Sequence, residues 1–73
     1  MVTPYEDFMA GAALSKEAAE GWMNEARKAK ERGDERFYLR CLSQAEEAAI
    51  RAEWYETRAA WYAPKHEQKD IAA

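Results

Sequence analysis

The sequence contains few of the residues that interrupt helices or cross-link small folds. Its 73 residues include three glycines, two prolines and one cysteine, and the only β-branched residues are Val2, Thr3, Ile50, Thr57 and Ile71. A single cysteine excludes an intrachain disulfide and favours a reducing compartment. Abundant alanine with so few glycines, prolines and β-branched residues is typical of an all-α protein.

Patterns for metal binding, secretion and membrane insertion are also missing. The one histidine, His66, lies in a polar C-terminal stretch with only Glu67 as a neighbouring ligand type. No apolar run approaches the roughly 18 residues that span a bilayer, and the first residues lack a basic-then-apolar signal pattern. We therefore expect a cytoplasmic protein that uses no metal or other cofactor and contacts no membrane.

The charge balance argues against nucleic-acid binding. Eleven Lys/Arg are interleaved with fourteen Asp/Glu, which gives a net charge of −3, whereas a non-specific nucleic-acid binder normally has a clear basic excess. A helical hairpin that binds RNA through its outer faces would need basic residues on one face. This alternative is the weakest, and we expect no direct contact with nucleic acid.

The longest regular pattern runs from Gly33 to Tyr62. Small and aromatic residues recur there at alternating spacings of three and four, which indicates one face of a helix: Tyr38, Cys41, Ala45, Ala48, Ala52, Tyr55, Ala59 and Tyr62. A second stripe, nearly opposite at 100° per residue, consists of Leu39, Ile50, Trp54 and Trp61. A helix that is apolar on two sides is expected to have two partners.

The N-terminal half predicts another long helix. Thr3 is a suitable N-cap, Pro4 suits the first helical position, and Glu6 completes a capping box. A matching 3-4 spacing follows, at Tyr5, Phe8, Ala12, Ser15, Ala19, Trp22, Ala26 and Ala29. Residues 4–32 form either one helix or two that break near Leu14, with Ser15 capping the second. The apolar phase does not slip at Ser15, which favours one helix.

A short turn at residues 33–34 joins this helix to a second one over residues 35–63. Gly33 suits a left-handed C-cap and Asp34 an N-cap, and Pro64 ends the second helix before a tail at 64–73. So short a connection predicts an antiparallel helical hairpin in a single domain, residues 1–73. An alanine-rich seam buries little area, so we expect the hairpin to dimerise into a four-helix assembly. The expected core and dimer residues are Phe8, Ala19, Trp22, Cys41, Leu42, Ala45, Ala52, Tyr55 and Tyr62.

Catalysis is not expected. Cys41 has no histidine near it in the helical register and falls on the seam, so it is interpreted as a packed structural cysteine. Carboxylate pairs such as Glu46 and Glu47 have no apolar pocket residues arranged around them and are interpreted as solvated helix surface. Phosphate-binding loops, serine elbows and metal motifs are absent from the sequence.

Aromatic residues of the second half are the candidate binding residues. Trp54 and Trp61 lie seven residues apart on one face with Ile50, and they either bury inside the hairpin or a homodimer or dock another protein. Phe37 and Tyr38, near the turn, form a second candidate patch. Arg58 is either a rim contact beside the tryptophans or a solubilising charge.

Residues 33–62 resemble a known family. The elements are Gly-Asp at 33–34, Tyr-Leu-x-Cys-Leu at 38–42 and Glu-Trp-Tyr-Glu-x-Arg-Ala-x-Trp-Tyr at 53–62. They resemble the ANR family, small helical AraC negative regulators, and its phage-encoded relatives that act as anti-quorum-sensing proteins. In that family the second helix tends to end with a tryptophan, an arginine and an alanine at this spacing, followed by an aromatic residue or cysteine. The matching positions here are Trp54, Arg58, Ala59, Trp61 and Tyr62.

The resemblance implies a dimerising helical hairpin that inhibits a bacterial transcription regulator of the AraC or LuxR type. Binding would block the regulator's dimerisation or its access to DNA, in the host cytoplasm if the protein is phage-encoded. The alternative is a structural or assembly homodimer whose aromatic faces are satisfied internally and which has no regulator target.

Overall fold

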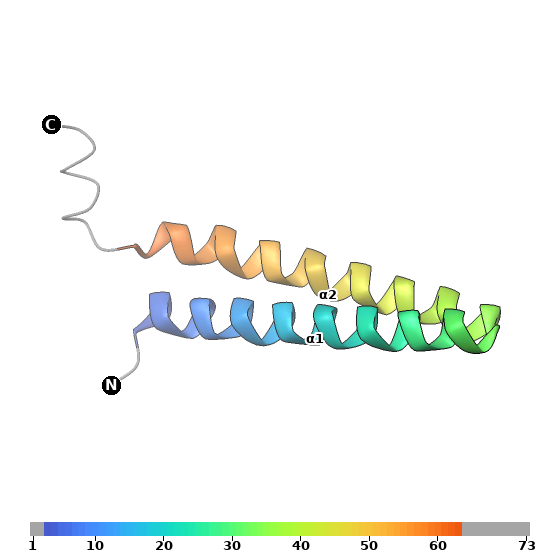
Figure 1. Ribbon diagram of the computed structural model, residues 1–73. Coiled ribbons are helices and arrows are strands. Elements are labelled where there is room, and N and C mark those ends of the chain that lie inside the picture. The colour runs from blue at the N-terminus through green and yellow to red at the C-terminus, as the bar shows by residue number, and fades with distance from the viewer. Residues whose placement is uncertain (1–2, 64–73) are drawn as a thin grey trace, which may run out of the picture.

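The structure, a computed structural model, describes residues 3–63 and contains two antiparallel α-helices. Helix α1 spans Pro4–Arg32 and helix α2 spans Glu35–Trp61. Figure 1 shows the two helices lying along each other, with the turn at one end, here called the closed end, and Pro4 and Trp61 at the opposite, open end. The predicted all-α helical hairpin is confirmed, and α1 runs unbroken through Ser15.

Local sequence signals fix the start of α1. The Thr3 hydroxyl accepts a hydrogen bond from the Glu6 backbone N–H at 3.2 Å, and the Thr3 carbonyl accepts one from Asp7 at 3.0 Å. Pro4 occupies the first helical position, where its missing N–H costs nothing. Glu6 and Asp7 place negative charge where the helix dipole is positive.

The connection at the closed end consists of two caps in direct succession. Gly33 adopts the left-handed conformation (φ 79°), and the N–H of Asp34 donates to the Ala29 carbonyl at 2.9 Å. The Asp34 carboxylate then accepts from the Phe37 N–H at 3.2 Å and so begins α2. Since no loop residues intervene, the chain reverses within one turn and the helices are forced to pack together.

Helix α2 ends at Trp61, two residues before the end expected from the sequence. Tyr62 is the C-cap, and its N–H donates to the Ala59 carbonyl at 3.0 Å. The residue before a proline is restricted away from helical backbone, which accounts for an end before residue 63. The expected tail at residues 64–73 lies outside the described residues.

The seam between the helices consists almost entirely of small side chains. Within residues 3–63 the largest fully buried side chain is that of Cys41, and the other buried residues are Ala12, Ser15, Ala26, Ala29, Ala45, Ala48, Ala52 and Ala59. Large apolar residues remain outside the seam, each at least 41 % exposed: Met9, Leu14, Met23, Leu39, Ile50, Trp54, Trp61 and Tyr62. The hairpin therefore buries little of the apolar area that its sequence carries.

Two glycines within α1 have opposite surroundings. A Cβ atom built on Gly11 would lie 2.8–2.9 Å from ring atoms of Tyr55, whereas one on Gly21 would meet nothing within 4 Å. Gly11 therefore provides the room in which the Tyr55 ring packs against α1. Gly21 serves no comparable packing purpose.

We expect alanine substitutions at these two glycines to act in opposite directions. Gly21→Ala should stabilise the fold by about 0.5–1 kcal/mol through helix propensity alone. Gly11→Ala should destabilise it by about 1–3 kcal/mol because the Tyr55 ring must move. Urea unfolding followed by circular dichroism, at one fixed protein concentration, measures both changes. Equal stabilisation by the two substitutions would contradict the packing of Tyr55 on Gly11.

Candidate functional site

Aromatic rings gather around Phe8 at the open end. The Phe8 ring stacks on Tyr62 with centroids 5.6 Å apart and planes 18° apart, and it meets Tyr55 at 6.3 Å. It also meets the Trp54 ring edge-on, at 6.0 Å and 69°. One side chain from α1 thus contacts two rings of α2 and the ring of its C-cap, Tyr62, beside the alanine packing of the seam.

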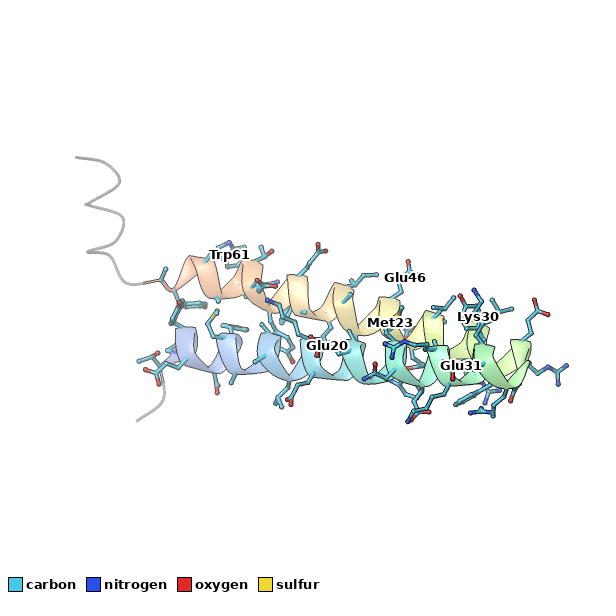
Figure 2. The ribbon with its side chains drawn as sticks, in the orientation of Figure 1. Glu20, Met23, Lys30, Glu31, Glu46 and Trp61 are labelled. Atoms are coloured by element: carbon cyan, nitrogen blue, oxygen red, sulfur yellow. The ribbon has the colours of Figure 1, made fainter. Side chains whose placement is uncertain are left out.

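Arg58 joins this packed group to the surface. Its guanidinium carbon lies 4.9 Å from the Trp54 ring centroid and 4.6 Å from that of Trp61. Positions 54, 58 and 61 share one face of α2, so the cation lies between the two indoles. Trp54 is 48 % exposed and Trp61 65 % exposed, and Figure 2 shows Trp61 on the side of α2 away from α1.

We call the six residues Phe8, Trp54, Tyr55, Arg58, Trp61 and Tyr62 the open-end cluster. Its inner part is packed between the helices, and its outer part presents indole faces and a guanidinium to solvent. Such a surface offers broad apolar contact together with hydrogen-bond donors that suit a carboxylate. Tryptophan, tyrosine and arginine are the residue types most enriched at protein-binding hot spots.

The prediction that the large apolar residues of the second stripe all lie on the outer side of α2 is therefore correct only in part. Trp54 does not stand apart from the seam, because its ring edge reaches Phe8 and it also contacts Tyr55 at 5.2 Å. A long aromatic side chain can reach back over the neighbouring helix from a position that helical angles alone place outside. Trp61 and Ile50 do remain exposed.

The second predicted patch, at the closed end, is covered by cations. The Lys30 ammonium lies 5.6 Å from the Tyr38 ring centroid, and the Arg32 guanidinium lies 5.8 Å from that of Phe37. Both aromatic residues are half-buried. The basic last turn of α1 therefore packs on these rings and leaves less of them free than of Trp61.

The residues expected in the core or dimer interface fall into three groups. Cys41, Ala45 and Ala52 are buried in the seam. Phe8, Ala19, Trp22, Leu42 and Tyr55 are half-buried. Tyr62 lies beyond the last residue of α2 and is 50 % exposed, so it is not a core residue of the hairpin, although one face of its ring stacks on Phe8.

A shallow groove follows the contact between the helices along one face of the hairpin. It is lined at its centre by Ala19, Glu20, Met23, Asn24, Arg27, Leu42, Ala45, Glu46 and Ala49. Towards the open end it continues along Lys16, Ile50, Glu53 and Glu56, where the Lys16 ammonium pairs with the Glu56 carboxylate at 3.4 Å. We call this feature the alanine groove, and Figure 2 shows Met23, one of its lining residues, where the two helices run beside each other.

The sequence interpretation did not identify the alanine groove. Its signal was present, since Ala19 of the first half and Ala45 and Ala49 of the second half fall on or beside the expected seam. Two helices that meet through alanine leave a depression wherever no larger side chain overhangs the contact. Recognising it required the register of one helix against the other, which no local pattern specifies.

The described part of the chain offers no assembled metal site. Residues 3–63 contain no group of three or more His, Cys, Asp or Glu side chains placed to hold an ion. Over the same residues, neither helix combines the length and apolarity required to cross a membrane. His66 lies outside the described residues.

Comparison with protein-family models, curated proteins and solved structures gives no match for this chain. The resemblance to the AraC negative regulators rests on the residues quoted above, and it stays a prediction.

We expect Phe8→Ala and Trp61→Ala, which remove an inner and an outer side chain of the open-end cluster, to lower the free energy of unfolding by different amounts. Phe8→Ala should cost about 2 kcal/mol or more, because it removes three aromatic contacts between the helices. Trp61→Ala should cost less than about 1 kcal/mol, because the indole is 65 % exposed and its cation–π contact with Arg58 lies at the surface.

Urea unfolding at a fixed protein concentration measures both values. A loss of stability in Trp61→Ala as large as that in Phe8→Ala would show that Trp61 belongs to the folded core.

Proposed function

We propose that this protein is a small non-enzymatic inhibitor that acts as a homodimer and binds a bacterial DNA-binding transcription regulator. The open-end cluster is the binding surface. The observation that carries the proposal is the exposed stack of Trp54, Arg58 and Trp61, whose rings and guanidinium hold one another in place.

The arrangement of this stack supports a binding role. A side chain that is already held in place loses little conformational entropy when a partner covers it. Trp54 is held by Phe8 and Tyr55, and Arg58 is held between the two indoles. An indole that remains 65 % exposed, as in Trp61, leaves a large apolar area in water until a partner covers it.

The class of partner comes from the family resemblance. The positions that carry the resemblance at the end of the second helix, Trp54, Arg58, Ala59, Trp61 and Tyr62, coincide with most of the open-end cluster. In the AraC negative regulators and their phage relatives this role is inhibition of an AraC-type or LuxR-type regulator in the bacterial cytoplasm. Such inhibition requires a complementary surface and no catalytic group, which agrees with the residues present.

Dimerisation is supported by the apolar surface that the hairpin leaves exposed. Apolar burial contributes about 25 cal/mol per Å², and ordering a residue costs about 1–2 kcal/mol. A seam in which the largest fully buried side chain is Cys41 contributes little against that cost, while Met23, Leu42 and Ile50 remain at least partly exposed. A second copy in a four-helix assembly would cover more of this area.

A structural homodimer with no regulator target is the second candidate. It is favoured by the contact of Trp54 with Phe8, which shows that part of the cluster already serves the hairpin. In that case Trp61 would also be buried once two copies associate, and its fluorescence emission would be shifted to the blue in the dimer.

We expect Trp61→Ala and Arg58→Ala to weaken binding to the regulator while helicity is retained. The experiment expresses each variant in bacteria that carry reporters for AraC-type and LuxR-type regulators, and it measures reporter inhibition and co-purification of the regulator. Removing the exposed indole or the cation that holds it should reduce affinity by about tenfold or more.

Leu14→Ala is the matched control, since Leu14 is 66 % exposed and lies on α1. It should inhibit as well as the parent chain. Full inhibition by the Trp61 and Arg58 variants would place the binding surface elsewhere. If the parent chain neither inhibits nor captures any regulator of the two classes, the regulator proposal is wrong.

A further inference from the structure

We propose that the second copy of this chain lies on the alanine groove, with α1 of one protomer packed antiparallel against α1 of the other. This inference rests on the homodimer proposed above and adds its face, direction and register. Three observations carry it: the size of the face, the distribution of charge between the two ends, and the spacing of Glu20 and Arg27.

The first observation is the size of the uncovered face. A helix of 29 residues is about 43 Å long, and two helices side by side are about 20 Å wide. One face of the hairpin therefore offers about 800 Å², which is what each partner buries in a standard stable interface. The small Ala45 and Ala49 side chains allow a facing helix to approach closely, and Met23 and Leu42 provide larger side chains to insert beside them.

The second observation is a charge difference between the closed and open ends. Residues 27–40, around the turn, contain six Lys/Arg and three Asp/Glu, whereas the remainder of residues 3–63 contains three Lys/Arg and nine Asp/Glu. A parallel dimer would bring the two basic closed ends together. An antiparallel dimer places the basic closed end of each protomer over the acidic part of its partner, which is electrostatically favourable.

The third observation fixes the register. Glu20 and Arg27 both line the alanine groove and lie seven residues apart on the same side of α1. The midpoint between them falls between Met23 and Asn24. In a two-fold dimer each contact occurs twice, so an antiparallel α1–α1 contact centred on that midpoint pairs Arg27 of each protomer with Glu20 of the other.

The same two-fold axis also relates α2 of one protomer to α2 of the other. The contacts of Lys16 with Glu56 and of Lys30 with Tyr38 show which residues of the two helices lie at the same level. The α1 midpoint then falls opposite about residues 46–47 of α2, so the stretch of α2 that lines the alanine groove, from Leu42 to Ala49, faces the same stretch of the partner.

In a parallel dimer on this face, the residues that line the groove would make less favourable contacts. Rotation about the long axis of the hairpin would set α1 on the partner's α2 at the same level. Met23 would then face Glu46, and Arg27 would face Leu42. Both pairs would bury a charged group against an apolar side chain without a partner.

We expect charge reversal at positions 20 and 27 to weaken the dimer singly and to restore it in combination. Arg27→Glu alone sets a carboxylate against Glu20 twice in each dimer, and Glu20→Arg alone sets a cation against Arg27 twice. Each single change should raise the dimer dissociation constant by about tenfold or more at low salt, and the double change should return it to within about threefold of the parent value. Sedimentation equilibrium measures all four proteins.

Glu17→Arg and Lys28→Glu are matched controls, since they make the same charge changes at exposed positions outside the alanine groove. They should leave the dissociation constant within about threefold. Circular dichroism checks that each variant stays helical. A parent chain that is monomeric at all concentrations would overturn the homodimer itself, whereas a dimer without rescue in the double variant would overturn only this face and register.

Disulfide trapping tests independently whether the two protomers pack parallel or antiparallel. In a Cys41→Ala background, Asn24→Cys lies next to the proposed two-fold axis and should form an intermolecular disulfide on mild oxidation. Glu35→Cys, at the closed end, should not, because an antiparallel arrangement holds the two closed ends far apart. Efficient cross-linking through position 35 with none through position 24 would establish a parallel dimer and refute the proposal. Regulator capture by the open-end cluster is scored separately and does not depend on this result.

Discussion

The close approach of two helices through alanine is the constraint on which the rest of the structure depends. Because no fully buried side chain in the described seam is larger than that of Cys41, the helices pack closely and bury little area. The larger apolar residues are consequently displaced to the faces and ends of the hairpin. The surfaces available for self-association or for binding a partner are therefore a direct result of how the hairpin is closed.

At the open end several aromatic rings pack together across the contact between the helices, and one of these rings also contacts Arg58, which lies against the exposed Trp61. Gly11 leaves room for Tyr55, Phe8 packs against Trp54, and Arg58 lies between Trp54 and Trp61. A continuous chain of contacts thus leads from the inside of the hairpin to its most exposed indole. The same residues hold the helix ends together and fix the geometry that a partner would meet.

Features that depend on local chemistry could be predicted from the sequence, whereas features that depend on helix register could not. Thr3, Gly33 and Asp34 determine the helix start and the turn through hydrogen bonds within four or five residues, and a 3-4 spacing was enough to find the alanine seam. The contact of Trp54 with Phe8 depends on how the two helices are aligned along their lengths. The basic excess of residues 27–40 lies in one continuous stretch of the sequence, whereas the total count of charges indicated only interleaving.

The proposed direction of the dimer also determines how the open-end clusters would be used. In an antiparallel assembly the two clusters lie at opposite ends, separated by about one helix length, on the order of 40 Å. One small dimer would then present two identical surfaces too far apart to act as a single site. A dimeric regulator could contact both only if its own sites had a matching spacing, and otherwise each dimer would bind two regulator molecules. The alanine seam, by exposing one face for a second copy, would in this way set the number and spacing of the binding surfaces.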